Sequence, residues 1–372
     1  MRIGFDVAQT CVEKAGCGWY ADSLIRAMVN LAPQHDYTLY HHFDGWINAT
    51  TDAGTSLAAR GVAEPFRDLD ARQAEAAWVR VRAGEPLPGH PDIVHANCYQ
   101  APRLRGSKLV FTVYDISFWM VPEYTTEENR LTCQNGMLRA LRNADGFVFI
   151  SQSSKDEFDR VLPTWLEASG RPWLVTPLGF QTSPAGGTRP ATRDYWLAVG
   201  SLEPRKNYEG LLDAMELYWR QSSRRLPLQI AGGAGWKSER LRQRIEAMQA
   251  RKMVSYLGYV PAERLSELYT QAEALIFPSW YEGFGLPVIE AMACSCPTIS
   301  SDRTSLKEVG GEAVLYVDPA RPAGIAEAML RVEQNEDLQR TLSRSGVARA
   351  SGFTWERTAA RTLKFYRRVL DA

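Results

Sequence analysis

The chain has 372 residues, which is longer than a domain with a single hydrophobic core usually is, so we expect two domains. Hydrophobic residues make up 45% and charged residues 23% of it, as in an ordinary globular protein. Lysine plus arginine and aspartate plus glutamate each total 43, and this balance argues against a general nucleic-acid-binding protein, which needs a basic excess.

Five short apolar runs in the first half predict strands at residues 2–7, 37–41, 93–95, 109–114 and 146–150. The first of these runs favours a strand at the N-terminus over a signal peptide. A helix is predicted after it, because apolar side chains recur at helical spacing in Tyr20, Leu24, Met28 and Leu31.

Two glycines, Gly16 and Gly18, stand between the first strand and this helix. Glycine lets a backbone approach a ligand closely, but a plain tight turn fits the same residues, and both interpretations stay open. Ala21 stands where a third glycine would complete a dinucleotide fingerprint, and His42 follows the second strand where an acidic residue would be needed. An NAD site is therefore disfavoured.

The segment 181–194 is rich in proline, glycine and threonine and predicts a linker, which separates domains of residues 1–180 and 195–372. Beyond it, strands are predicted at residues 195–199, 228–231, 254–256, 274–277 and 298–300, and helices at 201–215, 241–248 and 265–272. Such alternation is typical of the α/β class, with two Rossmann-like αβα domains facing across a cleft. Ligands of these domains bind beyond the carboxyl ends of the strands.

Two cations follow the first strand of the second domain. Arg205 and Lys206 come after a turn that contains Ser201, at the predicted start of a helix. The planar fork of arginine and the compact charge of lysine suit a diphosphate. A solvated basic pair at a helix end is the alternative.

A glycine-rich turn with two carboxylates lies at residues 282–293, between Glu282 and Glu290. Pro287 fits the first turn of a helix, because its ring presets φ and no hydrogen-bonded N–H is lost there. A helix start attracts phosphate, whereas a carboxylate accepts hydrogen bonds from sugar hydroxyls. The turn therefore predicts binding of a nucleotide sugar.

The six cysteines show no CxxC pair or other zinc-ligand spacing, so structural zinc is not expected. With an NAD site disfavoured as well, we expect no cofactor. No apolar run is long enough to span a bilayer. We expect a cytoplasmic protein and leave open a peripheral contact with the inner face of the membrane. The apolar run 118–121 fits either contact with a lipid-linked acceptor or a packed loop anchor.

The second domain resembles the retaining glycosyltransferases of family GT4, which have the GT-B fold. The resemblance rests on residues 199–207, 258–260, 281–292 and 305–309, in that order. The first domain resembles the family more loosely, at residues 16–20, 111–118 and 148–151. The resemblance implies that the first domain binds the acceptor and that the second domain binds the nucleotide-sugar donor. It also implies that no metal ion is needed.

By the same resemblance, Arg205 and Lys206 hold the donor diphosphate and Glu282 holds the sugar. Glu290 accepts hydrogen bonds from the ribose, and Tyr259 and Val260 lie beside the base. The complete donor-binding set implied is Gly16, Gly18, Ser201, Tyr259, Val260, Gly283, Phe284, Gly285, Leu286 and Glu290. The implied reaction is transfer of a hexose, with mannose from GDP-mannose as the leading expectation, to a glycan or lipid-linked hydroxyl in polysaccharide or O-antigen assembly.

One departure concerns Tyr114 and Asp115, which stand where the family usually has His-Asp. With Arg205, Lys206 and Glu282 they complete the expected catalytic set. In one interpretation the tyrosine substitutes for the histidine structurally. In the other, activity is reduced or lost, or the site accepts an unusual donor, because tyrosine does not titrate near neutral pH as histidine does. A nucleotide-sugar 2-epimerase and a non-catalytic partner subunit are the rival functions.

Overall fold

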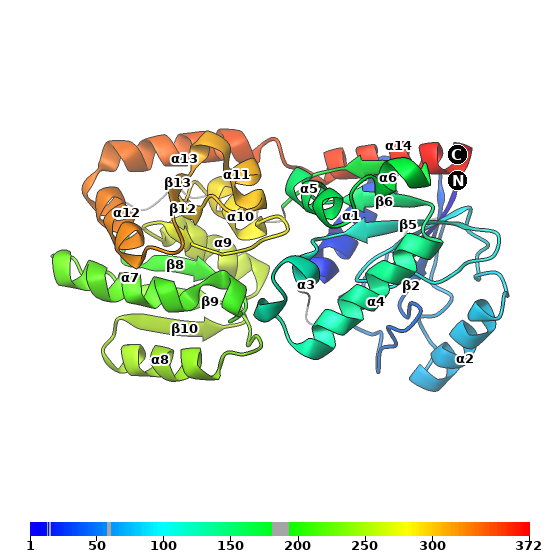
Figure 1. Ribbon diagram of the computed structural model, residues 1–372, viewed down its shortest axis with the longest axis horizontal. Coiled ribbons are helices and arrows are strands. Elements are labelled where there is room, and N and C mark those ends of the chain that lie inside the picture. The colour runs from blue at the N-terminus through cyan, green and yellow to red at the C-terminus, as the bar shows by residue number, and fades with distance from the viewer. Residues whose placement is uncertain (13, 15, 58–60, 181–192) are drawn as a thin grey trace. The chain divides into compact units, whose positions relative to one another are not determined.

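A computed structural model describes residues 1–12, 14, 16–57, 61–180 and 193–372. The chain forms two compact units (Figure 1). Unit 1 comprises Met1–Trp119, Glu128–Gly179 and Thr354–Ala372, and unit 2 comprises Met120–Glu127 and Phe180–Phe353. Most of the predicted linker, residues 181–192, lies outside the described residues.

Unit 1 is built on a seven-stranded parallel sheet with the order β3-β2-β1-β4-β5-β6-β7. Its strands are β1 (Arg2–Asp6), β2 (Asp36–Tyr40), β3 (Val62–Ala63), β4 (Ile93–Ala96), β5 (Lys108–Val113), β6 (Gly146–Phe149) and β7 (Trp173–Val175). Its helices are η1 (Ala8–Thr10), α1 (Gly16–Leu31), α2 (Ala71–Arg82), α3 (Ser117–Met120), α4 (Glu127–Asn143), α5 (Gln152–Val161), α6 (Trp165–Ser169) and α14 (Trp355–Asp371). The central strands are buried along almost their whole length, as parallel strands covered on both faces are.

Unit 2 is built on a six-stranded parallel sheet with the order β10-β9-β8-β11-β12-β13. Its strands are β8 (Trp196–Val199), β9 (Leu228–Ala231), β10 (Val254–Gly258), β11 (Leu275–Phe277), β12 (Thr298–Ser301) and β13 (Leu315–Val317). Its helices are η2 (Pro122–Tyr124), η3 (Pro204–Lys206), α7 (Tyr208–Gln221), α8 (Glu239–Ala250), α9 (Ala262–Gln271), α10 (Leu286–Ala293), α11 (Ser305–Gly310), η4 (Gly311–Ala313), α12 (Pro322–Gln334) and α13 (Glu336–Ala350). The core of this unit centres on Trp196, Leu211, Tyr218, Ile230 and Met329.

The strand order of each sheet reverses once, between β1 and β4 in unit 1 and between β8 and β11 in unit 2. At such a switch point the loops beyond neighbouring strands part, which leaves a crevice where α/β sheets bind ligands. The fold therefore assigns a ligand crevice to the carboxyl ends of β8 and β11.

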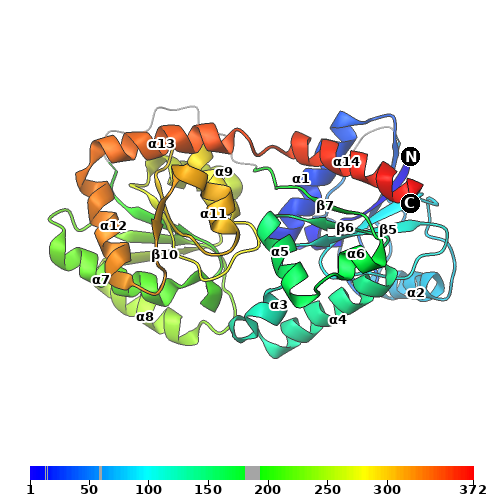
Figure 2. The same ribbon diagram turned by 45° about the horizontal axis from the view of Figure 1, so that its top comes forward.

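The predicted second domain, residues 195–372, extends too far along the chain. Its last helix, α14, packs in unit 1 alongside α1 (Figure 2). The apolar face of α14 buries Phe365 and Tyr366 there. Thr358 anchors the start of the helix, since its hydroxyl donates to the Pro177 carbonyl at 2.7 Å. Sequence patterning identifies an amphipathic helix but not the sheet that it covers.

All ten predicted strands are present, and the sequence missed only the short strands β3, β7 and β13 among the described residues. Two local predictions were wrong. The helix predicted at 201–215 begins later than expected. Residues 201–207 form a loop and a 3-10 turn, and α7 begins at Tyr208. The predicted glycine turn is the first turn of α1, where Gly16 and Gly18 are already helical.

Candidate active site

The loop after β8 is tied to the loop after β11 by Asn207, the residue that follows η3. Asn207 has a left-handed backbone (φ 57°), and its side-chain amide donates to the carbonyls of Pro278 at 3.1 Å and Pro319 at 2.9 Å. The Trp280 N–H donates to the Arg205 carbonyl at 2.8 Å. These bonds fix the two predicted phosphate-binding cations at the switch point of unit 2.

An ion cluster occupies this position. The Glu282 carboxylate accepts from Lys206 Nζ at 2.6 Å and from Arg205 Nη1 at 2.7 Å, and Arg205 Nε donates to Glu203 at 2.7 Å. Glu282 is only 6% exposed and Lys206 only 9%. Burial opposes ionisation of Glu282, but Arg205 and Lys206 outweigh it and hold the pKa of Glu282 below its usual value.

This geometry differs from the role that the family resemblance gives Glu282. Its carboxylate bridges the two cations, so the sugar would have to share it with them. Glu203 was missed, although it stands two residues before Arg205. Burial lowers the pKa of Lys206, while its ammonium also lies 4.8 Å from the centre of the Phe277 ring.

The glycine-rich loop leads into α10, as predicted, with Pro287 in the first turn of the helix. Gly285 caps the helix with φ 107°, and a Cβ there would lie 2.6 Å from Leu306. Ser305 holds the loop from the start of α11, since its hydroxyl donates to the carbonyls of Glu282 at 2.9 Å and Phe284 at 2.8 Å. The helix start is therefore fixed beside the ion cluster.

Glu290, within α10, is half-buried and accepts a hydrogen bond from the Tyr269 hydroxyl at 3.0 Å. Burial raises the pKa of Glu290 to about 7, although the tyrosine hydrogen bond opposes this. A carboxylate with one donor partner keeps acceptor capacity for further hydroxyls. Tyr269 was missed, because nothing local in the sequence connects it to Glu290.

The other predicted donor residues of unit 2 lie at the same edge of its sheet. Ser201 follows β8 and is half-buried, whereas Tyr259 follows β10 and is 48% exposed. Val260 comes next and is half-buried. Gly283 and Leu286, also half-buried, flank the helix start. The carboxyl ends of β8, β10 and β11 thus carry the predicted donor set of this unit.

In unit 1, Tyr114 and Asp115 follow β5 and are engaged internally. The Tyr114 hydroxyl donates to Asn97 Oδ1 at 3.3 Å, and its ring meets Tyr20 edge to face at 5.3 Å. Burial raises the pKa of Tyr114 well above its ordinary value. The Asp115 carboxylate accepts from the Ser117 N–H at 3.0 Å, at the start of α3. The packing fits the structural role that we considered for Tyr114.

The switch point of unit 1 contains a buried carboxylate that sequence reasoning missed. Asp6 ends β1 and accepts hydrogen bonds from the N–H groups of Ala8 and Asn97, both at 3.0 Å, and from the Gln9 amide at 2.9 Å. Burial raises the pKa of Asp6 to about 7, against these hydrogen bonds. The available signal was a carboxylate inside the otherwise apolar run of residues 2–7.

The two glycines of α1 differ in their surroundings. A Cβ on Gly18 would lie 2.8 Å from the Gln9 carbonyl oxygen, so the helix can approach η1 only with glycine there. No atom lies within 4 Å of the same position on Gly16. Gly16 therefore has the free space that a ligand contact needs, and Gly18 serves packing.

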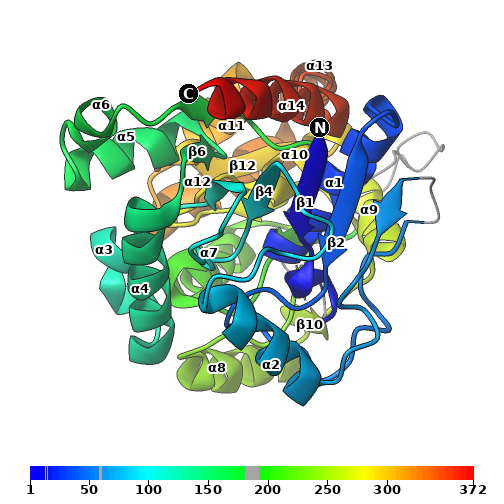
Figure 3. The ribbon, with the colours of Figure 1, turned by 90° about the vertical axis from the view of Figure 1, so that its right-hand side faces the viewer.

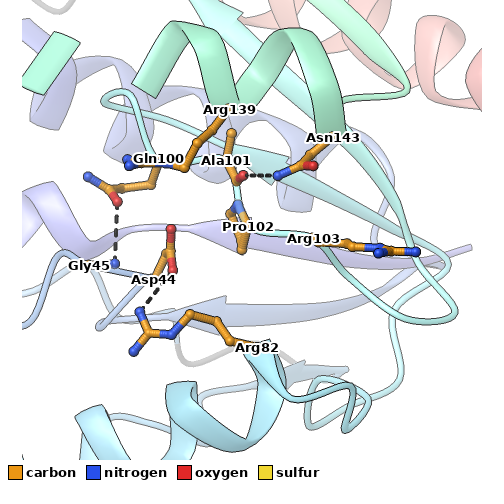
Figure 4. A pocket seen from close by; sticks show the side chains of 9 residues that line it. All are labelled: Asp44, Gly45, Arg82, Gln100, Ala101, Pro102, Arg103, Arg139 and Asn143. Atoms are coloured by element: carbon orange, nitrogen blue, oxygen red, sulfur yellow. Dashed lines mark hydrogen bonds and ion pairs between the residues drawn. The ribbon is translucent and has the colours of Figure 1, made fainter. Parts of the chain in front are cut away.

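Unit 1 also holds a cavity of about 290 Å³ (Figure 4). Its wall is polar, but much of it is engaged: Arg82 pairs with Asp44 at 3.2 Å, and Asn143 donates to the Ala101 carbonyl at 2.8 Å. The lining residues are Asp44, Gly45, Arg82, Gln100, Ala101, Pro102, Arg103, Arg139 and Asn143. None of the predicted site residues lines this cavity.

The apolar run 118–121 is anchored by Phe118, which is buried in α3, while Trp119 is half-buried. The packed-anchor interpretation fits this burial. Over the described part of the chain, no cluster of His, Cys, Asp and Glu has the three members that a metal ion would need. The same residues include no helix with the length and apolar character to cross a bilayer.

Comparison with known proteins connects these features to a family. The family described as "Glycosyl transferases group 1" matches residues 180–349. The chain is 33% identical over 284 residues to O-antigen chain mannosyltransferase B of Escherichia coli, which covers 74% of each protein. It is 35% identical over 144 residues to O-antigen chain mannosyltransferase RfbU of Salmonella typhimurium (strain LT2), covering 39% of this chain and 40% of that relative.

Among solved structures, sucrose-phosphate synthase from Thermosynechococcus elongatus matches with a TM-score of 0.74 and 20% sequence identity. The match covers 100% of this chain and 99% of that chain. At this identity the likeness bears on the fold alone. Together with the two parallel doubly wound sheets, these matches place the chain in the group 1 glycosyltransferases, with the GT-B fold.

Proposed function

We propose that the protein is a retaining glycosyltransferase, which moves a hexose from a nucleoside diphosphate to a hydroxyl of a glycan or lipid-linked acceptor. The observation that carries the proposal is the cluster of Arg205, Lys206 and Glu282 beside the start of α10. It brings two cations and a helix start to one switch point, where a diphosphate can meet both.

The chemical step leaves a diphosphate, so stabilisation of its growing charge is the main task of the site. The bond from the anomeric carbon to the phosphate oxygen breaks, and a new bond forms to the acceptor oxygen. The acceptor proton passes to the departing phosphate. Arg205, Lys206 and the first turn of α10 are already in place before reaction, which is the condition for effective electrostatic stabilisation.

The same cations support a mechanism without a metal ion. Arg205 and Lys206 can neutralise the diphosphate in the role that a divalent cation plays in other enzymes. Activity that withstands a chelator would agree with this mechanism, and activity that is lost with EDTA and restored by Mn²⁺ would contradict it.

The nucleoside end of the donor is assigned to Glu290, Tyr259 and Val260. Glu290 retains acceptor capacity for ribose hydroxyls beyond its bond from Tyr269, and the exposed Tyr259 ring can lie against a base. GDP-mannose is the proposed donor and a saccharide of O-antigen type the proposed acceptor, because the relatives named above are O-antigen mannosyltransferases.

The test is incubation of the purified chain with GDP-mannose, GDP-fucose, UDP-glucose and UDP-N-acetylglucosamine, each with and without mannose-terminated oligosaccharides. We expect release of GDP from GDP-mannose, fastest when an acceptor is present. The one-bond C1–H1 coupling in the NMR spectrum of the product should show an α-linked mannose. The product would then have the same anomeric configuration as the donor, as the proposed retention requires.

Other outcomes separate the rival functions. A new nucleotide-linked sugar formed without an acceptor would indicate the 2-epimerase, which the comparisons do not favour. Absence of both donor binding and turnover would indicate a partner subunit and contradict the proposal. Turnover of a UDP-sugar alone would keep the transferase and replace mannose.

A further inference from the structure

The outward face of α14 carries a row of cations. The helix buries its apolar side chains in unit 1 and leaves one side exposed. The exposed cations, which we call the α14 basic face, are Arg357, Arg361, Lys364, Arg367 and Arg368. The exposed acidic residues of the helix, Glu356 and Asp371, stand at its two ends. The five cations extend over roughly 16 Å of helix, at 1.5 Å per residue.

The middle of this row has no carboxylate partner. Among the described residues, the side chains of Arg361, Lys364 and Arg367 make no ion pair and no hydrogen bond to protein. By contrast, the exposed Arg340 on α13 pairs with Glu336 and Asp337, and the half-buried Arg244 on α8 pairs with Glu209 and Asp213. The chain as a whole has a formal net charge of zero, so the α14 basic face is a local concentration of positive charge on one surface.

Further positive charge lies beside the row. The N-terminus lies on the side of unit 1 that α14 covers (Figure 3), and the Arg367 guanidinium is close enough to His35 to affect the pKa of its imidazole. Burial, the N-terminal ammonium and Arg367 together lower the pKa of His35, against the nearby Asp36. Positive charge therefore accumulates at the C-terminal end of α14.

An exposed indole borders the same end of the row. Trp173 of β7 is 38% exposed, and its carbonyl accepts from Arg368 Nη2 at 2.9 Å. Lys155 Nζ lies 4.5 Å from the centre of a Trp173 ring. An exposed tryptophan among cations is the arrangement that favours a headgroup interface, where the ring meets the upper acyl region and the cations meet phosphate.

We propose that the α14 basic face docks unit 1 on a bilayer of anionic phospholipid. Three observations favour a bilayer over a nucleic acid: the row is straight, its aromatic neighbour is one tryptophan at its edge, and the chain as a whole has no basic excess. The contact is peripheral and electrostatic, and it goes beyond the glycosyl transfer proposed above.

The test measures co-sedimentation of the full chain with vesicles of phosphatidylglycerol mixed with phosphatidylcholine, and with phosphatidylcholine alone. We expect binding to the anionic vesicles only, with release at high salt. The triple variant Arg361→Gln, Lys364→Gln, Arg367→Gln should bind about 100-fold more weakly, because each cation near an anionic surface contributes a factor of about five. Trp173→Ala should weaken binding by less than this triple variant does.

A matched triple variant in unit 2, with Arg240→Gln and Arg242→Gln in α8 and Arg251→Gln directly after it, makes the same change in net charge and should bind like the wild type. Circular dichroism and melting confirm that both variants fold. Failure of the wild type to bind anionic vesicles would overturn the proposal, and so would equal losses in the two triples. Binding to a DNA duplex without binding to vesicles would also overturn it. Donor turnover is measured separately, so a loss of docking is distinct from a loss of transfer.

Discussion

In both units the sheet order reverses once, and the loops at the two reversals carry different chemistry. At the reversal of unit 1, Asp6, Asn97 and Tyr114 form a buried chain of hydrogen bonds. At the reversal of unit 2, Glu282 bridges two cations. The topology favours a ligand site at each position, but among the described residues only the second reversal has charges suited to a phosphate.

The difference shows that a switch point is a location and not yet a function. The hydrogen bonds of unit 1 join Asp6 to Asn97 and Asn97 to Tyr114, and among the described residues only the buried Gln9 Oε1 at this reversal has no hydrogen-bond partner. In unit 2, the Lys206 ammonium has hydrogens beyond the one that Glu282 accepts, Arg205 adds a second positive charge, and α10 adds a helix start. Breaking each network separately tests this contrast.

The largest expected effect follows removal of a cation from unit 2. Lys206→Ala should lower turnover by about 1000-fold, because it removes a buried group aimed at the leaving phosphate. Nucleoside diphosphate affinity should fall as well, and isothermal titration measures it. Lys108→Ala, which removes a surface ion pair with Asp145 in unit 1, is the control and should keep wild-type kinetics. Unchanged donor affinity in Lys206→Ala would remove the diphosphate assignment.

The next effect is on stability. Glu282→Gln should destabilise unit 2 by about 3 kcal/mol, because it leaves Lys206 and Arg205 without their shared buried partner. Urea denaturation measures the change. Glu209→Gln breaks the half-exposed pair with Arg244 and should cost less than about 1 kcal/mol. Equal losses in the two variants would mean that the buried cluster is not structural.

A glycine pair sharpens the comparison on the side of unit 1. Gly18→Ala should cost about 2 kcal/mol, because its methyl group would overlap the Gln9 carbonyl. Gly16→Ala meets open space and should stabilise α1 by roughly 0.5 kcal/mol. Thermal melting compares them. A fall in turnover in the stable Gly16→Ala variant would assign a ligand contact to Gly16, whereas wild-type turnover would argue against it.

Glu290 gives a pH dependence. Its folded pKa of about 7 lies above its unfolded value, so the folded state binds the proton more tightly. Its contribution to stability is full at low pH and is lost as pH rises towards and through 7. Glu290→Gln should therefore melt about 3 °C above the wild type at pH 8 and converge with it in acid.

Donor binding by the wild type should respond in the opposite sense. Ribose hydroxyls donate to the ionised carboxylate, so affinity for the donor should increase as pH rises through about 7. Glu290→Gln should bind the donor more weakly and without this pH dependence. A wild-type affinity that is flat from pH 6 to pH 8 would contradict the assignment of Glu290 to the ribose.

The sequence predicts what depends on local pattern. Buried parallel strands such as β5 appear as apolar runs, and Pro287 after a glycine turn identifies the start of α10. The pairing of Glu282 with Lys206 joins residues 76 positions apart, and no local spacing encodes it. The attachment of α14 to unit 1 is likewise a tertiary choice between two sheets. Asp6 was missed because its partners come together only when β1 and β4 pair.

The smallest expected effect concerns Tyr114, and it decides between the two interpretations of this residue. Tyr114→Phe removes one hydrogen bond to Asn97 and keeps the edge-to-face contact with Tyr20, so it should cost about 1 kcal/mol of stability. If the tyrosine only fills space, turnover should stay within about twofold of the wild type. A loss of about 100-fold with normal folding would place the hydroxyl in the reaction. Tyr114→His restores the residue usual in the family, and a gain in turnover there would mean that the tyrosine limits the wild-type rate. Wild-type rates in the phenylalanine variant would leave unit 2 as the source of catalytic charge, in agreement with the contrast between the two switch points.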